Sequence, residues 1–290
     1  MNAIPTSLVT GGTNGIGLET ARALARLGHK VVIVSRNPDK CRRVVEELRS
    51  GTGNPNIDFI AANLSSLAEV RRAAAEFRER HGRLDRLVNN AGVSLARRRE
   101  SADGFEYMFA LNHLAGFLLT GLLLDLLVAS APSRVVNVAS GMYPQAKLNL
   151  DDLQSTRKFS AMTNYANSKL CNILFTTELA RRLAGTKVTV NAAGPGLVRT
   201  NIGQEEGGLF AFGKRMADFF GGKTPEQGAD TIVWLATAPE VEELSGRYFE
   251  KRKELPLAPK ALEPGLALRL WQASESLTNF RYSVPASRNS

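Results

Sequence analysis

The chain has 290 residues, of which 43% are hydrophobic, and this composition is sufficient for one globular domain with a sizeable core. Two cysteines and three scattered histidines are too few for a disulfide framework and offer no metal-ligand spacing, so we expect no metal site. The formal net charge is +9, but the arginines are dispersed among carboxylates, and only Arg97–Arg99 forms a compact run. We therefore expect no nucleic-acid partner, and part of the charge suits an anionic cofactor.

The N-terminus lacks the cationic segment and long apolar run of a signal peptide. The longest apolar stretch, from Leu114 to Ala129, is interrupted by Asp125 and is too short to span a membrane. It is typical of a buried helix. We expect a cytoplasmic protein with no membrane span.

Short β-branched runs alternate with longer helical patterns along the chain. The predicted strands are 7–10, 30–35, 57–61, 84–89, 134–139, 187–193 and 246–250. The predicted helices are 15–28, 38–50, 66–81, 104–130, 160–184 and 225–237, and another amphipathic helical pattern closes the stretch 255–277. This alternation predicts an α/β fold: a Rossmann-type doubly wound parallel sheet of about seven strands, with helices on both faces. We expect a single domain over residues 1–290, because no linker divides it.

A glycine-rich turn follows the first predicted strand and precedes the first helix. It reads Thr10-Gly-Gly-Thr-Asn-Gly-Ile-Gly17, which gives the predicted cofactor residues Gly11, Thr13, Asn14, Gly15, Ile16 and Gly17. Glycines here permit a tight turn and close approach to a pyrophosphate, which the helix N-terminus then attracts. Ordinary turn chemistry is the alternative, but the strand–turn–helix context favours dinucleotide binding.

The end of the second strand selects between dinucleotides. An acidic residue there binds the ribose 2′-hydroxyl of NAD, whereas arginine accommodates the 2′-phosphate of NADP. The chain reads Val34-Ser35-Arg36-Asn37, with no acid before Asp39. Arg36 therefore predicts NADP(H), and the alternative is an exposed turn arginine.

Tyr165 and Lys169 are four residues apart in a predicted helix, so they share one face. A cation roughly 5 Å from the phenol, at an effective dielectric of about 20, favours the phenolate by about 3 kcal/mol, or about two pKa units. The spacing thus predicts a tyrosine general acid/base with a lowered pKa. An isolated pair of this kind would more often be two exposed polar residues.

Further motifs follow in order. They are Leu87-Val-Asn-Asn-Ala-Gly92, Asn112-His-Leu-Ala-Gly-Phe, Ser140, Tyr165-Ala-Asn-Ser-Lys169 and Gly194-Pro-Gly-Leu-Val-Arg-Thr200. With the glycine turn, this series resembles the short-chain dehydrogenase/reductase family over nearly the whole chain. The chain looks most similar to its retinol-dehydrogenase-like branch, which includes WW-domain-oxidoreductase relatives.

The resemblance implies roles for these residues. Tyr165 would exchange the substrate proton, Lys169 would lower its pKa and bind the nicotinamide ribose, and Ser140 would polarise the carbonyl. Asn112 would hold a water of a proton relay; a helix-interior amide satisfied by a backbone bulge is its alternative. The remaining implied cofactor contacts are Asn63, Leu64, Asn90, Ala91, Gly92, Pro195, Gly196, Val198 and Thr200.

Two departures from the family pattern matter. Asn63-Leu64 replaces the Asp-Leu that many relatives use to bind the adenine amino group, and the amide oxygen can still accept that bond. Gly141-Met142-Tyr143 follows Ser140, where retinol-type members often have a small residue and histidine, which alters the pocket rim.

The predicted substrate pocket is apolar. Its walls are Val93, Met142 and Tyr143, together with a lid at about 201–223 that contributes Phe210, Phe212 and Met216. Packing of these aromatics on the core is the alternative. An apolar lining predicts a lipophilic ketone, aldehyde or alcohol as the substrate.

We therefore expect an NADP(H)-dependent alcohol dehydrogenase or carbonyl reductase. A non-catalytic NADP-binding sensor or interaction protein, and an epimerase, dehydratase or double-bond reductase on the same scaffold, are the alternatives. The helices 104–130 and 160–184 form dimer faces in many relatives, so a homodimer is one expected assembly.

Overall fold

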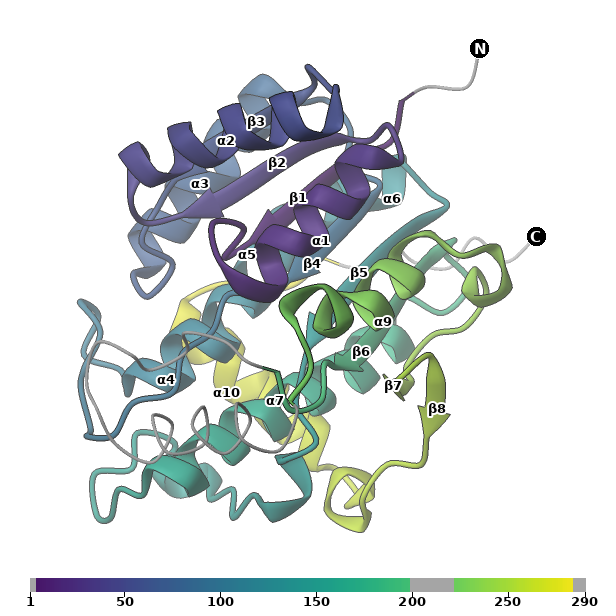
Figure 1. Cartoon of the computed structure of the whole chain (residues 1–290). Helices are drawn as coiled ribbons and strands as arrows, with labels where there is room; N and C mark the ends of the chain where they lie inside the picture. The colour runs from purple at the N-terminus through teal and green to yellow at the C-terminus, as the bar shows by residue number, and fades with distance from the viewer. Residues whose placement is uncertain (1–3, 199–221, 284–290) are drawn as a thin grey trace.

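The computed structural model describes residues 4–198 and 222–283. Eight strands form one sheet in the order β3-β2-β1-β4-β5-β6-β7-β8 (Figure 1). They are β1 (Thr6–Thr10), β2 (Lys30–Ser35), β3 (Ile57–Ala61), β4 (Arg86–Asn89), β5 (Ser133–Val138), β6 (Val188–Gly194), β7 (Tyr248–Glu250) and β8 (Lys253–Leu255). All neighbouring pairs are parallel except β7 and β8, so the carboxyl ends of seven strands share one edge.

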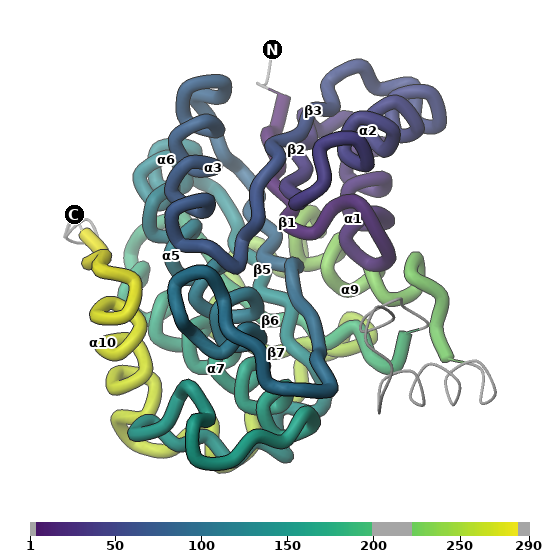
Figure 2. Tube along the Cα trace, turned by 90° about the vertical axis from the view of Figure 1, so that its left-hand side faces the viewer, coloured from purple at the N-terminus to yellow at the C-terminus, as the bar shows by residue number. Residues whose placement is uncertain are grey.

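Helices cover both faces of this sheet, as Figure 2 shows from the side. They are α1 (Gly15–Arg26), α2 (Pro38–Thr52), α3 (Leu67–Arg80), α4 (Tyr107–Phe109), α5 (Ala115–Leu122), α6 (Leu124–Ala129), α7 (Ala161–Arg182), α9 (Pro225–Thr237) and α10 (Leu266–Thr278). The α1, α2 and α9 helices lie on one side, and α3, α5 and α7 lie on the other. The doubly wound α/β prediction is confirmed.

The β2 strand shows why these residues form a doubly covered sheet. Val31 and Ile33 belong to the core beneath α1 and α2, whereas Val32 and Val34 belong to the core on the opposite face. Because side chains alternate in a strand, a continuous apolar run can serve both layers only when both faces are covered. All four side chains are almost fully buried.

The sheet has one strand more than the seven predicted. The β8 strand returns antiparallel to β7 after a turn at Lys251 and Arg252, which both have positive φ angles. Its residues Lys253–Leu255 are exposed and include two charged side chains. These residues do not show the alternation of apolar and polar side chains by which a strand is recognised in a sequence, so β8 was not predicted.

The single helix predicted over 104–130 is wrong. Glu106 caps α4 by accepting from the amides of Met108 and Phe109, and a π-helical segment follows at Ala110–Leu114 before α5 begins. The chain breaks again at Leu123, between α5 and α6. A π-turn is not visible in an apolar pattern, because it is recognised by the hydrogen bond from the Ala115 amide to the Ala110 carbonyl.

The last described segment packs across the helices on one face. The α10 helix lies against α7, and Arg182 of α7 stacks 4.1 Å from the ring centroid of Trp271. The Tyr282 hydroxyl then donates to the Phe117 carbonyl of α5. These contacts cover part of the two helices from which we predicted a homodimer, and that assembly stays a prediction.

Candidate active site

The glycine turn between β1 and α1 packs too closely to admit side chains. Gly11 and Gly15 have φ angles of 68° and 52°, which favour glycine. A Cβ on Gly17 would lie 2.3 Å from the carbonyl oxygen of Gly11, which no real contact permits. The helix begins at Gly15 without a side-chain cap from Asn14 and has no acidic residue in its first turn. Its first amides are therefore suited to bind an anion.

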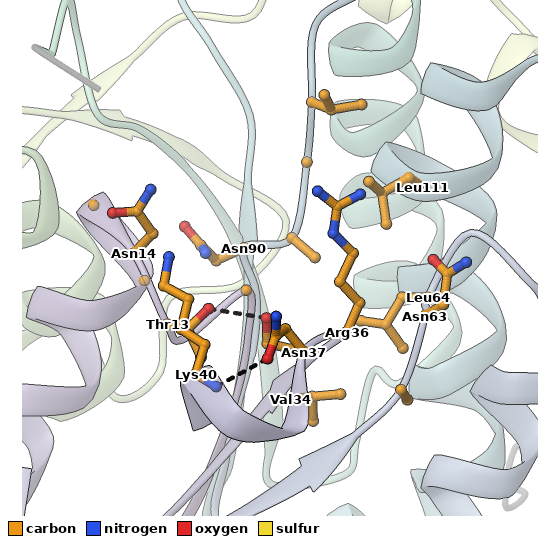
Figure 3. A pocket seen from close by; sticks show the side chains of 18 of the residues that line it. Thr13, Asn14, Val34, Arg36, Asn37, Lys40, Asn63, Leu64, Asn90 and Leu111 are labelled. Atoms are coloured by element: carbon orange, nitrogen blue, oxygen red, sulfur yellow. Dashed lines mark hydrogen bonds between the residues drawn. The ribbon is translucent and has the colours of Figure 1, made fainter. Parts of the chain in front are cut away.

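A cavity of about 540 Å³ opens over this turn and the carboxyl ends of β1, β2, β3 and β4 (Figure 3). The predicted cofactor residues that line it are Gly11, Thr13, Asn14, Gly15, Ile16, Gly17, Arg36, Asn63, Leu64, Asn90, Ala91 and Gly92. This is the edge at which open α/β sheets bind ligands. The cavity thus joins four separate stretches of the sequence.

Arg36 has a basic neighbour that the sequence analysis missed. Asn37 caps α2 by accepting from the Lys40 amide at 2.9 Å, and Lys40 lines the cavity with its side chain toward Thr13 and Asn14, whereas Arg36 points toward Leu111 (Figure 3). The Thr13 and Ser35 hydroxyls are hydrogen-bonded at 2.9 Å and join the glycine turn to the end of β2. The available signal was the Asn37-Pro38 helix start, which places position 40 in the first turn.

Asn63 lines the cavity at the end of β3, as predicted for an adenine contact. Its side-chain oxygen already accepts from the amide and the hydroxyl of Ser65, at 3.3 and 2.9 Å. This local turn fixes the orientation of the amide. Adenine binding by Asn63 stays a prediction.

The structure brings Ser140, Tyr165 and Lys169 together at the carboxyl end of β5. Ser140 follows β5 and is hydrogen-bonded to the Tyr165 hydroxyl. The Lys169 ammonium lies 5.5 Å from the centroid of the Tyr165 ring and donates to the Val138 carbonyl at 3.0 Å. Both α7 residues are buried, so the alternative of two exposed polar residues does not apply.

Burial raises the pKa of Tyr165, and its hydrogen bond with Ser140 only partly opposes that effect. Burial also lowers the pKa of Lys169 to about 8. The prediction of a lowered Tyr165 pKa is therefore wrong. That prediction assumed a partly solvated pair, whereas the two residues are only 9% and 4% exposed, so loss of hydration is the largest influence on the pKa of the phenol.

Gly92 joins the cavity to this cluster. A Cβ at Gly92 would lie 3.2 Å from the side-chain oxygen of Asn112 and 3.5 Å from the Lys169 nitrogen. Gly92 also lines the cavity. A ligand that passes Gly92 therefore reaches the buried amine and phenol.

Asn112 lies in the π-helical segment and holds the chain after β4. Its amide accepts from the Val93 nitrogen at 2.8 Å and donates to the Val93 oxygen and the Ser168 hydroxyl, each at 2.9 Å. The backbone bulge considered as its alternative is present, and the side chain connects the segment after β4 to α7. Its predicted part in a proton relay remains untested.

The predicted pocket walls divide into two groups. Val93 and Met142 pack against the cluster of Leu95, Met108 and Tyr165. Tyr143 instead points into the core, where its hydroxyl accepts from the Ala258 amide at 2.8 Å and its ring meets Tyr248. Tyr143 is only 2% exposed, so the prediction that it forms a wall of the substrate pocket is corrected. Its hydroxyl is satisfied by a backbone amide in the interior.

Four predicted residues lie outside the described part of the chain: Thr200, Phe210, Phe212 and Met216. Most of the predicted lid at 201–223 is also outside it.

Pro195, Gly196 and Val198 follow β6 but do not line the cavity. Lys223 donates to the Pro195 carbonyl at 3.2 Å, and Val198 packs with Ile16 against Gly228 of α9.

A family model described as short chain dehydrogenase matches residues 5–207. The chain belongs to this family. It is 44% identical to retinol dehydrogenase 14 of Mus musculus, over 93% of this chain and 84% of that protein. Polyprenol dehydrogenase of Homo sapiens is 39% identical, with 94% and 84% covered. The predicted retinol-dehydrogenase-like relationship is confirmed, and the chain is an oxidoreductase of this family.

Solved structures agree with this assignment. A Mycobacterium paratuberculosis protein has a TM-score of 0.79 and 30% identity, with 97% of this chain and 96% of that one covered. The Pseudomonas aeruginosa RhlG/NADP active-site complex has a TM-score of 0.69 and 28% identity, with 85% and 94% covered.

Neither a helix long and apolar enough to cross a membrane nor a metal-binding group of His, Cys, Asp and Glu occurs within 4–198 and 222–283.

Proposed function

We propose that this chain is an NADP(H)-dependent oxidoreductase that interconverts a lipophilic ketone or aldehyde and its alcohol, with Tyr165 as the general acid/base. One observation carries the proposal. The buried Ser140–Tyr165–Lys169 cluster adjoins, through Gly92, a cavity built on the glycine turn.

The cavity fits a nicotinamide dinucleotide. The glycine turn leaves its helix amides accessible, and Arg36 and Lys40 supply positive charge at the end of β2, where a 2′-phosphate would lie. None of the described residues that line the cavity is acidic. The NADP in the related Pseudomonas aeruginosa structure supports this choice. Such a coenzyme would supply or accept the hydride.

The chain's own residues then handle the substrate oxygen and its proton. In the reductive direction, the Tyr165 hydroxyl donates its proton to the carbonyl oxygen, while the Ser140 hydroxyl orients that oxygen by a hydrogen bond. Burial raises the pKa of Tyr165, which keeps the phenol protonated near neutral pH. That protonation state suits donation, and the nearby Lys169 ammonium stabilises the phenolate that remains.

The apolar surroundings of Tyr165 support a lipophilic substrate. Leu95 and Met108 are buried against it, and Val93 and Met142 pack on the same cluster. The names of two relatives specify the alcohols retinol and polyprenol. We extend to this chain only the class that they share, a lipophilic alcohol or its carbonyl counterpart.

The test is NADPH oxidation, followed by absorbance, with a panel of lipophilic aldehydes and ketones. Tyr165→Phe should lower kcat by about 10³-fold, because only the hydroxyl is removed, and NADPH affinity should be retained. Tyr282→Phe is the matched control, since it removes a tyrosine hydroxyl that donates to the Phe117 carbonyl of α5. Normal turnover by Tyr165→Phe would refute the proton role. NADPH binding without oxidation of any alcohol or reduction of any carbonyl would favour the sensor alternative.

A further inference from the structure

Two side chains of α7 donate to one backbone carbonyl, that of Val138 at the end of β5. The Lys169 ammonium donates to this oxygen at 3.0 Å, and the Asn172 amide donates to it at 3.1 Å. Both side chains are buried. The function proposed above uses Lys169 but gives no part to Asn172.

The Val138 carbonyl needs side-chain donors because the ladder between β4 and β5 ends beside it. Alternate residues of β5 direct their amide and carbonyl toward β4, as the bond from the Arg134 amide to the Asp85 carbonyl shows. Val138 lies four residues after Arg134 and faces the same way, so the strand register would offer its carbonyl the Ala91 amide. That amide donates instead to the Thr10 hydroxyl at 2.9 Å. A buried carbonyl without a donor is costly, and α7 supplies the donors.

One donor would satisfy this carbonyl, yet two are present, and they differ in freedom. A carbonyl oxygen has two lone pairs and can accept from both. Lys169 has a flexible four-carbon stem and three N–H groups, whereas the Asn172 side chain is short. The backbone of Asn172 is also tied to the sheet, because its carbonyl accepts from the Thr176 hydroxyl at 2.7 Å and Thr176 accepts from the Asn137 amide of β5 at 2.9 Å. Asn172 is therefore the fixed donor, and Lys169 is the donor that can move.

Lys169 lies at the border of the cavity. A Cβ on Gly92, which lines the cavity, would be 3.5 Å from the Lys169 nitrogen. The three protons of this ammonium are its only means of binding, since it has no acceptor. A coenzyme in the cavity would therefore compete with the Val138 carbonyl for them.

We propose that Asn172 is a positioning residue for Lys169: it keeps the Val138 carbonyl hydrogen-bonded when the ammonium turns from that carbonyl toward a coenzyme in the cavity. The proposal rests on the coenzyme binding proposed above. Without the Asn172 amide, the same movement would leave a buried carbonyl without a side-chain donor, and Lys169 would stay bound to the backbone.

The test is a double-mutant cycle on NADPH binding, measured by equilibrium titration. Asn172→Leu removes the amide but keeps most of the side-chain volume, and it should raise the Kd for NADPH by about 5- to 30-fold. In a Lys169→Met background the same substitution should change the Kd by less than about twofold, because no ammonium then has to leave the carbonyl. Asn191→Leu on β6 is the matched control. It also removes a buried amide that binds the backbone, and its effect should be equal in both backgrounds.

Unfolding of the free protein in urea gives a readout without coenzyme. Each single substitution leaves one donor on the Val138 carbonyl, but the Lys169→Met/Asn172→Leu double variant leaves neither. Its loss of stability should therefore exceed the sum of the two single losses. Asn172→Ala is a second variant without the amide and should give the same pattern.

Equal rises in the Kd in both Lys169 backgrounds would overturn the proposal, and so would additive losses of stability in urea. Failure of the wild-type chain to bind NADPH would refute the proposed function. In that case a loss of stability beyond additivity would still assign Asn172 to the carbonyl that it shares with Lys169.

Discussion

The nucleotide end of the cavity presents its cations to solvent, whereas the catalytic end, the adjoining cluster of Ser140, Tyr165 and Lys169, buries its cation. Arg36 is exposed and Lys40 is half-buried, but the ammonium of Lys169 is enclosed between β5 and α7. Exposed charges act by attraction over distance. The buried pair instead has shifted pKa values, with that of Lys169 lowered to about 8.

This difference in burial suits the nucleotide end to binding and the catalytic end to proton transfer. At the nucleotide end, backbone amides and solvated charges can attract phosphates with little cost of desolvation. At the catalytic end, burial brings an amine close to titration at physiological pH and holds a phenol in its protonated form. The two ends should therefore respond differently to substitution and to pH.

Replacement of Lys169 by methionine should have the largest effect, a loss of about 10²- to 10³-fold in kcat, because it removes the only described cation beside Tyr165 while it preserves most of the side-chain volume. NADPH titration and steady-state kinetics separate the affinity from kcat. Lys158→Met, at an exposed position, is the control. A normal kcat in the Lys169 variant would mean that the buried end needs no cation.

Gly17→Ala tests the nucleotide end through its backbone. The new Cβ would meet the Gly11 carbonyl at 2.3 Å, so the turn must open, and we expect about a 10²-fold higher Kd for NADPH. Gly82→Ala is the matched control, because nothing lies within 4 Å of its Cβ. Tight coenzyme binding by a folded Gly17 variant would show that the turn does not hold the phosphates.

Arg36→Asp tests the solvated charge at the same end. The ratio of NADPH to NADH affinity should fall by about 10- to 100-fold, since an attractive charge becomes repulsive. Lys40→Gln should lower the ratio less, because an ammonium is a point charge without the guanidinium fork. Equilibrium titrations at two salt concentrations measure both. An unchanged ratio in the Arg36 variant would remove the 2′-phosphate assignment.

The smallest predicted effect concerns His113, a buried residue whose pKa affects the pH dependence of stability. Burial lowers the pKa of His113 to about 3, so the unfolded chain, with an ordinary histidine, binds an extra proton below about pH 6.5. Stability should therefore fall as pH drops from about 6.5 toward 3, by at most about 1.4 kcal/mol per pH unit from this residue. His113→Asn should flatten the pH dependence of the urea midpoint. An unchanged slope would contradict a neutral buried imidazole.

The sequence predicted best those features that act through short motifs. The strand–turn–helix context of Gly11–Gly17 and the position of Arg36 identified the cavity, because glycine spacing and strand ends are local. The sequence did not predict Lys40, since its approach depends on the Asn37 cap. It also failed for the pKa of Tyr165, because the burial that raises this pKa comes from residues distant in the sequence, such as Leu95, Met108 and Met142.

Other parts of the prediction needed contacts between distant residues. Tyr143 reads as a pocket residue beside Ser140, but its hydroxyl is satisfied by Ala258, 115 residues later. The predicted helix over 104–130 is interrupted by a π-helical segment around Asn112 and again at Leu123, and no period in the sequence reveals either interruption. The cytoplasmic location and the homodimer stay predictions.

The aromatic closure at the end of α10 has a consequence for the order of folding. Tyr282 reaches the Phe117 carbonyl across 165 residues, and the Phe280 ring fills the space that a Cβ on Gly121 would occupy. This part of the interior therefore stays incomplete during synthesis until residue 282 has emerged, long after the strands beneath it are available. Until then the flank of α5 at Phe117 and Gly121 lacks its aromatic cover.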